Sequence, residues 1–465
     1  MSRPRTHLVQ DLLERLPPGQ VVPAADLLDV LGITRPTLGR LVADAGGRVV
    51  RLGRTRATAY VQRQATPAGS EWPLFRMRED GSLEELGQVM ALSGDTFYVQ
   101  TEGDRPNLVR PPEGDITGYF PGLPWYLDDL RPQGFLGRTF AHRRGRELGL
   151  PEDINRWQLG DTLQALVRAG GTEVGDLLLG GDVVASALAT MDAPPDRVRR
   201  DEREQRYPEW ATAALEGEDV GSSPGGEQPK FTATVEHGGG RYAALVKFAL
   251  PGAGEAAERW ADLLVCEHLA LEVLHEAGVS AAESSLIQTN SHTFLEVKRF
   301  DRSPDTLGRR GFVSLLALSS AFVGDNAGWD EAGEQLLALR WISRDTAIAM
   351  ARLHAFGRLI GNTDMHQGNI GFHLVDHGPL PLAPAYDMLP MSLAPSRTGV
   401  LRATTPIAQI APQRSGQLAH LQWAVPLAVN FWERVAESGL LRSRVLTQVA
   451  GENAERVRDM GRRFG

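Results

Sequence analysis

One short segment late in the chain constrains the fold more than any other feature of the sequence. Asp364 is followed five residues later by Asn369, and an apolar, β-like run over 370–375 begins directly after the asparagine. A second aspartate, Asp387, closes a second short apolar run. With this spacing a carboxylate can orient an attacking hydroxyl, while an amide oxygen and the second carboxylate hold a magnesium ion. The pattern predicts the catalytic loop of a phosphotransferase, although Asp and Asn are also common in ordinary polar turns.

The distribution of lysine points to a second part of this site. The chain has 49 basic residues, yet only Lys230, Lys247 and Lys298 are lysines. Lys247 lies in the apolar strand-like run 243–248, where a charged side chain is otherwise out of place. A lysine on such a strand is suited to hold nucleotide phosphates, often paired with a helix glutamate. Glu267 is the candidate partner, and an ordinary surface glutamate is the alternative.

A glycine-rich segment precedes this strand. Residues 221–230 contain Gly225 and Gly226 and end in Lys230. Glycines beside a strand let backbone N–H groups approach phosphate oxygens, and the lysine adds positive charge. The segment is therefore a candidate phosphate-binding loop, although loops of this composition are mostly simple turns.

The order of the predicted elements gives the fold class. A sheet-rich part precedes a mainly helical part, and the conspicuous polar residues lie where the two meet. We therefore predict an α+β, two-lobed, protein-kinase-like fold, with a small lobe over 72–300 and a helical large lobe over 301–465. The predicted strands lie near 230–235, 242–248 and 293–299, the inserted helix lies near 255–277, and hairpin-like pieces lie at 369–376 and 380–386.

Residues 1–64 differ from the rest of the chain in charge. They carry ten arginines and five acids, a net charge of +5, so the remaining chain carries −14 of the total of −9. Their apolar spacing predicts three helices followed by two β-like runs joined by an arginine-containing turn. We predict a winged helix-turn-helix domain that binds DNA, with a protein-packing module as the alternative. The candidate DNA-binding residues are Arg35, Thr37, Arg40, Arg54 and Arg56.

Several classes of protein are disfavoured. The chain opens without an apolar leader and has no apolar run long enough to span a membrane. Cys266 is its only cysteine, which rules out an intramolecular disulfide and a zinc cluster built on several cysteines. These features predict a cytoplasmic protein without membrane contacts.

Taken together, the motifs resemble those of the HipA family of serine/threonine protein kinases, the toxins of bacterial toxin–antitoxin modules. The resemblance extends from about residue 72 to the C-terminus. The segments that carry it are LDDLRPQG (127–134), SPGGEQPK (223–230), VKF (246–248), KRFDR (298–302), NTDMHQGN (362–369) and YDML (386–389).

The resemblance implies ATP and Mg²⁺ as cofactors and a role for several of these residues. Asp364 would be the catalytic aspartate, and Ser223, or its neighbour Ser222, the site of autophosphorylation. His366 would assist catalysis or brace the loop, and these two possibilities remain open. The implied magnesium ligands are Asn369 and Asp387, and the implied nucleotide-binding residues are Gly225, Gly226, Gln228, Lys230, Lys247, Lys298, Phe300 and Asp301.

The resemblance also implies partners. Better-known members of the family phosphorylate an aminoacyl-tRNA synthetase, so a protein substrate is expected here. Typical members rely on a separate DNA-binding antitoxin, whereas this chain resembles the long, single-chain branch with its own N-terminal domain. An antitoxin partner and a homodimer both remain possible, and the N-terminal domain is expected to repress the protein's own promoter.

Two other functions compete with this interpretation. The first is a DNA-binding regulator whose kinase-like body senses nucleotide without phosphoryl transfer. The second is a small-molecule kinase of the aminoglycoside-phosphotransferase type, which has a histidine two residues before the catalytic aspartate. In this chain that position is Asn362, which disfavours the second alternative.

Overall fold

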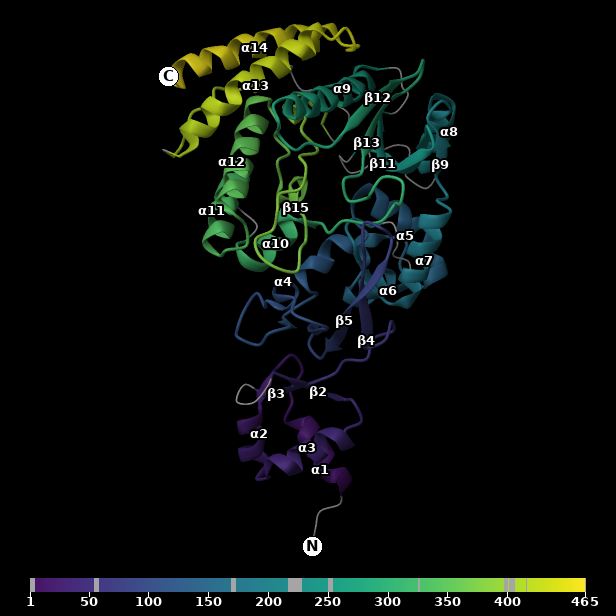
Figure 1. Ribbon diagram of the computed structural model, residues 1–465, viewed down its shortest axis with the longest axis vertical. Helices are drawn as coiled ribbons and strands as arrows, with labels where there is room; N and C mark the ends of the chain where they lie inside the picture. The colour runs from purple at the N-terminus through teal and green to yellow at the C-terminus, as the bar shows by residue number, and fades with distance from the viewer. Residues whose placement is uncertain are drawn as a thin grey trace.

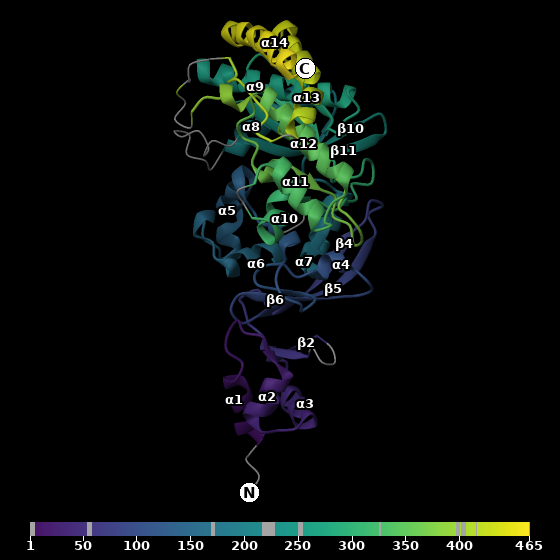
Figure 2. The ribbon, with the colours of Figure 1, turned by 90° about the vertical axis from the view of Figure 1, so that its left-hand side faces the viewer.

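We analysed a computed structural model of the chain. It describes residues 5–53, 58–168, 173–215, 228–249, 254–324, 327–396, 400, 406–414 and 416–464. The N-terminal unit projects from one end of the molecule, and the two last helices lie at the opposite end (Figures 1 and 2). Among the helices in these ranges, none is long and apolar enough to cross a lipid bilayer.

The N-terminal unit is a three-helix cluster with a small antiparallel sheet. Its strand order is β1-β3-β2, and its apolar core includes Leu12, Leu27 and Leu38. Gly32 ends the second helix with a φ of 60°, a left-handed conformation that glycine adopts without strain. The elements are α1 (Arg5–Glu14), β1 (Val22–Pro23), α2 (Ala24–Leu31), α3 (Arg35–Asp44), β2 (Val49–Leu52) and β3 (Ala59–Gln62).

A five-stranded antiparallel sheet follows, in the order β7-β6-β5-β4-β8. At the register shift between β4 and β5, Gly87 has a φ of 141°, and a Cβ there would lie 2.0 Å from the carbonyl oxygen of Gln100. Glycine is therefore required at this close approach. The elements are β4 (Glu71–Met77), β5 (Leu83–Leu92), β6 (Thr96–Thr101), α4 (Pro106–Val109), β7 (Tyr119–Phe120), the 3₁₀ helices at Trp125–Leu130 and Ile154–Arg156, α5 (Gly134–Leu148), α6 (Leu159–Arg168), β8 (Leu177–Leu179) and α7 (Gly181–Asp192).

A second five-stranded sheet, in the order β12-β13-β11-β10-β9, lies between two helices. Tyr207 of α8 packs against Phe231 and Phe294 on one face, and Leu264 of α9 packs against Leu295 and Val297 on the other. The elements are β9 (Arg197–Arg199), α8 (Arg203–Leu215), β10 (Lys230–His237), β11 (Gly240–Ala249), α9 (Glu255–Glu276), β12 (Ser284–Gln288) and β13 (Thr293–Lys298).

The remainder of the chain is mainly helical. Trp432, fully buried, donates a hydrogen bond from Nε1 to the Leu359 carbonyl and so joins α13 to α12. The largest hydrophobic core joins this helical part to the first five-stranded sheet, from Trp72 to Met460. The elements are β14 (Val313–Ser314), α10 (Leu315–Phe322), α11 (Trp329–Ala338), α12 (Arg344–Leu359), 3₁₀ turns at Gln367–Asn369 and Met391–Leu393, β15 (Gly371–Phe372), α13 (Gln417–Glu437) and α14 (Arg444–Phe464).

The sequence-based expectations differ from these elements in two places. The mixed-charge run 197–206 by itself predicts a connector or a solvated helix. In the structure its first three residues form β9, parallel to β10 with Val198 buried, and α8 begins at Arg203. The hairpin-like pieces expected at 369–376 and 380–386 are only partly regular. Gly371–Phe372 pairs with β14, and a few backbone bonds, such as His373 N to Pro381 O at 2.8 Å, close the hairpin.

Candidate active site

The site begins with a buried ion pair between the second sheet and the helix that covers it. Lys247 of β11 donates two hydrogen bonds from Nζ to Glu267 of α9, at 2.7 and 2.9 Å. The two side chains are 6% and 1% exposed. Burial holds the pKa of Lys247 below its ordinary value, and the Glu267 carboxylate opposes that shift. The expected partnership of these two residues is thus present, and it fixes α9 against the sheet.

Asp387 approaches the same ammonium group from the helical part. Its Oδ1 accepts a hydrogen bond from Lys247 Nζ, so one lysine contacts carboxylates from both halves of the molecule. Asp387 has a φ of 54°, a left-handed backbone conformation uncommon for a residue other than glycine. Such conformations persist where surrounding structure enforces them, and they concentrate at functional sites.

A buried amide joins the two loops that carry the candidate catalytic aspartates. Asn362 is 3% exposed, and its Oδ1 accepts from the Asp364 backbone N–H at 3.0 Å. Its Nδ2 donates to the Asp387 carbonyl at 3.1 Å. The single side chain therefore fixes the backbones of both aspartates relative to each other.

The other candidate metal ligand is held in the same loop. Asn369 Nδ2 donates to the Asp364 carbonyl at 2.9 Å, which leaves the amide oxygen of Asn369 as its remaining polar atom. Tyr386, next to Asp387, donates its hydroxyl hydrogen to the Gly368 carbonyl at 2.8 Å. Asp364 itself is exposed. The structure thus brings Asp364, Asn369 and Asp387 into one hydrogen-bonded assembly.

His366 forms bracing contacts within this loop. Its Nδ1 accepts a hydrogen bond from the Gly368 N–H at 3.0 Å, which caps the short 3₁₀ turn that contains Asn369. Its carbonyl accepts from Trp329 Nε1 at 3.1 Å. These contacts favour the bracing role that the sequence left open.

The candidate adenine-binding residues lie where β13 leaves the sheet. The Phe300 ring lies 5.7 Å from that of Tyr386, which places the segment beside Asp387. The Lys298 N–H donates to the Glu283 carbonyl at 2.8 Å, so the backbone of Lys298 is partly used by the sheet. Asp301 is buried, and its carboxylate accepts hydrogen bonds from Arg299, Arg302 and the Gly175 N–H. Its contact with ribose stays a prediction.

The remaining candidate residues are described only in part. Lys230 lies directly opposite Lys247 in the β10–β11 register, so both lysines face the same side of the sheet. Gln228 is half-buried, just before β10. In α3, Arg35 and Arg40 are exposed and Thr37 is half-buried. Outside the described residues lie Ser222, Ser223, Gly225, Gly226, Arg54 and Arg56.

The hairpin between Asn369 and Asp387 is anchored at its tip by the first sheet. Arg76 of β4 contacts Asp376 at 2.8 Å, and Arg105 contacts the other carboxylate oxygen. Asn107 donates from Nδ2 to the carbonyls of Val375 and Gly378, at 2.8 and 3.1 Å. Arg76 and Asp376 are separated by 300 residues in sequence, and the contacts of Arg105 and Asn107 with the hairpin span 268 to 271 residues. Neither they nor the bridging role of Asn362 emerged from the sequence, because no local pattern signals them.

Comparison with known proteins agrees with this geometry. Residues 222–459, just over half of the chain, match the HipA-like C-terminal domain. The chain belongs to the HipA family of toxins. Residues 68–188 of this HipA-family chain match the middle domain of YjjJ-like toxins. The HipA-like match covers strands β10 to β13 of the second sheet, the Lys247–Glu267 pair and most of the helical part.

The similarity to one relative covers nearly the whole HipA-family chain. It is 35% identical over 442 residues to the toxin YjjJ of Escherichia coli (strain K12), an alignment that covers 94% of this chain and 95% of that protein. Among solved structures it is similar to HipA in the Shewanella oneidensis MR-1 HipA, HipB and operator DNA complex. That comparison has 15% identity, a TM-score of 0.49, and covers 84% of this chain and 97% of the other.

Proposed function

We propose that this HipA-family chain is an ATP- and Mg²⁺-dependent serine/threonine protein kinase. The observation that carries the proposal is the convergence of Lys247, Glu267 and Asp387 beside the loop of Asp364 and Asn369. A phosphate-holding lysine, its helix glutamate and two loop ligands are the parts that phosphoryl transfer requires, since catalysis rests on positioning and electrostatics.

The residues fit a magnesium–nucleotide complex. Asn369 and Asp387 supply the hard amide and carboxylate oxygens that Mg²⁺ prefers. The Asp387 carboxylate already contacts one cation, the Lys247 ammonium, which supports its use for a metal. The metal would neutralise charge on the phosphates. Lys247 would bind phosphate oxygens, and Lys298 and Phe300 would present backbone groups to adenine.

Asp364 would act on the substrate hydroxyl. It is exposed, so a side chain of another protein can reach it, and Asn362 fixes its backbone. Its carboxylate would orient the serine or threonine hydroxyl and accept its proton during transfer. His366 would hold the loop in shape and thereby position Asn369.

The protein substrate is proposed by analogy with the family, with an aminoacyl-tRNA synthetase as the first candidate. Ser223, or Ser222, is the proposed site of autophosphorylation. ATP chemistry of this kind belongs in the cytoplasm, where a synthetase would also be available. The Shewanella oneidensis structure contains HipA with HipB and operator DNA. By analogy, a separate antitoxin is one candidate partner for this chain, and a second copy of the chain in a homodimer is the other.

The N-terminal unit is proposed to bind DNA as a winged helix-turn-helix domain. Three helices and a three-stranded sheet in the order β1-β3-β2 support this assignment. Arg35 and Arg40 lie exposed near the start and middle of α3, where a recognition helix contacts bases and phosphates. The domain would repress the protein's own promoter.

The test is incubation of the purified full-length chain with labelled ATP and Mg²⁺, followed by phosphopeptide mapping. We expect label on Ser223 or Ser222, and on an added synthetase substrate, from the wild type but not from Asp364→Asn or Asp387→Asn. Asp345→Asn, an exposed carboxylate in the same helical part, is the matched control and should behave as wild type. Nucleotide binding without transfer to any protein would support the nucleotide-sensing regulator instead.

A further inference from the structure

A buried tryptophan contacts the candidate catalytic loop from outside the loop. Trp329 is the first residue of α11 and is 1% exposed. Its indole Nε1 donates a hydrogen bond to the His366 carbonyl at 3.1 Å. The start of α11 is therefore bonded to the backbone of the loop that carries Asp364 and Asn369.

The carbonyl that Trp329 contacts also sets the position of Asn369. The Asn369 backbone N–H donates to the same His366 oxygen, also at 3.1 Å, and this bond closes the 3₁₀ turn at Gln367–Asn369. A carbonyl oxygen has two lone pairs and can accept both hydrogens. The indole N–H thus fixes the direction of the carbonyl on which the Asn369 backbone depends.

A second contact attaches the turn to the chain just before α11. Gln367 is 5% exposed, and its Nε2 donates to the Ala327 carbonyl at 3.0 Å. The same Nε2 lies 3.4 Å from the Gly324 carbonyl oxygen. The turn that contains Asn369 is therefore held at two points, by Trp329 and through the side chain of Gln367.

The start of α11 is itself held firmly. Asp330, next to Trp329, is 7% exposed, and its carboxylate accepts hydrogen bonds from Arg414 at 2.9 Å and from Gln417 at 2.8 Å. His354 Nδ1 lies 2.8 Å from the other carboxylate oxygen. These partners attach the first turn of α11 to α12 and to the start of α13. A group that positions a metal ligand must itself be held in place, and Trp329 meets this condition.

We propose that Trp329 and Gln367 are positioning residues for Asn369, the proposed magnesium ligand. The inference rests on the proposed kinase function. Both side chains bond to backbone carbonyls, so their effect on Asn369 is indirect and passes through the backbone of the turn. Substitution of residues that orient a metal ligand in this way typically reduces metal affinity or activity by about 10- to 100-fold.

The test compares Trp329→Phe with Trp72→Phe in the full-length protein. Each replacement removes one buried indole N–H, because Trp72 of β4 is 5% exposed and donates from Nε1 to the Ala68 carbonyl at 2.9 Å. We expect Trp329→Phe to lower kcat for phosphate transfer by about tenfold and to raise the half-saturating Mg²⁺ concentration by about the same factor. The KM for a protein substrate should change little. Trp72→Phe should resemble the wild type in all three quantities.

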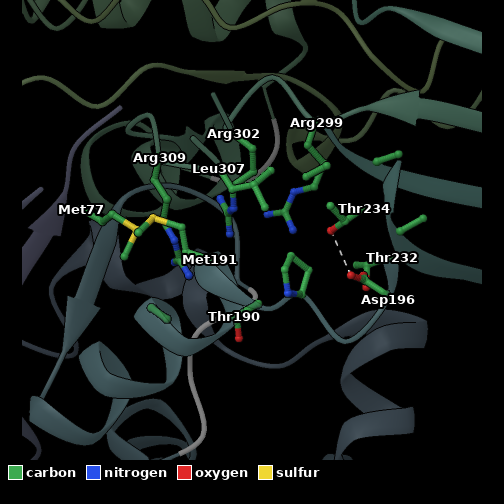
Figure 3. Close-up of a pocket in the computed structure, with 15 residues that line it drawn as sticks. Met77, Thr190, Met191, Asp196, Thr232, Thr234, Arg299, Arg302, Leu307 and Arg309 are labelled. Atoms are coloured by element: carbon green, nitrogen blue, oxygen red, sulfur yellow. Dashed lines mark hydrogen bonds between the residues drawn. The ribbon is translucent and has the colours of Figure 1, made fainter. Parts of the chain in front are cut away.

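A second measurement needs no catalysis. Hydrogen–deuterium exchange of the peptide 364–372, without nucleotide, should be about fivefold faster in Trp329→Phe and in Gln367→Met, the factor that corresponds to one lost hydrogen bond. Thr234→Val is the control for a buried hydrogen bond lost elsewhere. It removes the bond from Thr234 to Asp196 at 3.0 Å, in a cavity that β10, α7 and the segment after β13 line (Figure 3). Exchange of 364–372 should not change in this control.

Thermal unfolding identifies the variants that are folded. An unchanged Mg²⁺ dependence in folded Trp329→Phe, or unchanged exchange in both Trp329→Phe and Gln367→Met, would overturn the proposal. Equal changes in Trp72→Phe would also overturn it, because they would reflect a general loss of stability. If the wild type transfers no phosphate, the proposed kinase function fails, and exchange alone then decides whether Trp329 and Gln367 hold the turn.

Discussion

The two sides of the candidate active site differ in exposure. Lys247 and Glu267, which we propose hold the nucleotide side, are almost completely buried and bonded to each other. Asp364, which we propose faces the protein substrate, is exposed, and its backbone is held by Asn362. A nucleotide is small and always has the same structure, so it can be bound in a closed, preformed site. A protein substrate needs a site that is open to solvent. Substitutions should therefore affect stability on the first side and activity on the second.

The largest expected effect is the loss of phosphoryl transfer when the exposed Asp364 is substituted. Asp364→Asn removes the group that would accept the substrate proton, so phosphoryl transfer should fall by about 10³-fold, within the range for lost general-base catalysis. Because Asp364 is exposed, the free energy of unfolding should change little. Initial rates of phosphate transfer and urea unfolding of the same samples measure both. A large loss of stability in Asp364→Asn would contradict the expectation that substitutions at the exposed residues change activity and not stability.

Substitution in the buried Lys247–Glu267 pair should instead reduce stability. Glu267→Gln leaves a buried ammonium with one fewer charged partner, so the free energy of unfolding should fall by about 3 kcal/mol, as when a buried ion pair loses one member. Glu272→Gln is the control on the same helix, where the glutamate is exposed and lies 3.5 Å from His268. Urea unfolding curves provide both values. Equal and small losses of unfolding free energy in Glu267→Gln and Glu272→Gln would argue against a buried, preformed ion pair at this site.

Asn362 contacts the backbones of Asp364 and Asp387, so its substitution should reduce both stability and phosphate transfer. Asn362→Ala leaves the Asp364 N–H and the Asp387 carbonyl without their present partner, and the stability loss should be about 2 kcal/mol for a buried polar pair. Phosphate transfer should fall as well, since both aspartates lose their common support. Asn155→Ala, at an exposed asparagine, controls for the substitution itself. Unchanged transfer with reduced stability would limit Asn362 to a structural role.

The smallest effect is expected at the hairpin tip. Asp376→Ala removes the contacts with Arg76 and Arg105, so the loop to Asp387 should be less well positioned. We expect kcat to fall by about tenfold with little change in KM, because small misplacements reduce the rate of a step that depends on geometry. Asp104→Ala, an exposed aspartate near the same tip, is the control. A change in KM alone would contradict a positioning role.

The sequence predicted the parts of the site that have local patterns. A charge in an apolar strand marked Lys247, the D-x₄-N spacing marked the loop, and the strands and helix around them lie within two residues of the expected limits. The missed features depend on tertiary contacts. Asp376 contacts Arg76, which lies 300 positions away in the sequence, and no local pattern signals such a pair. The three-residue strand β9 is too short to show a periodic pattern.

The most direct test of the proposed kinase is to compare nucleotide binding with phosphate transfer in the same variants. Asp364→Asn should bind Mg²⁺–ATP by calorimetry as tightly as the wild type but transfer phosphate to Ser223, Ser222 or a substrate protein about 10³-fold more slowly. Asp387→Asn should lose both properties, because its carboxylate is a proposed metal ligand. Normal transfer by Asp364→Asn in a folded protein would contradict the account.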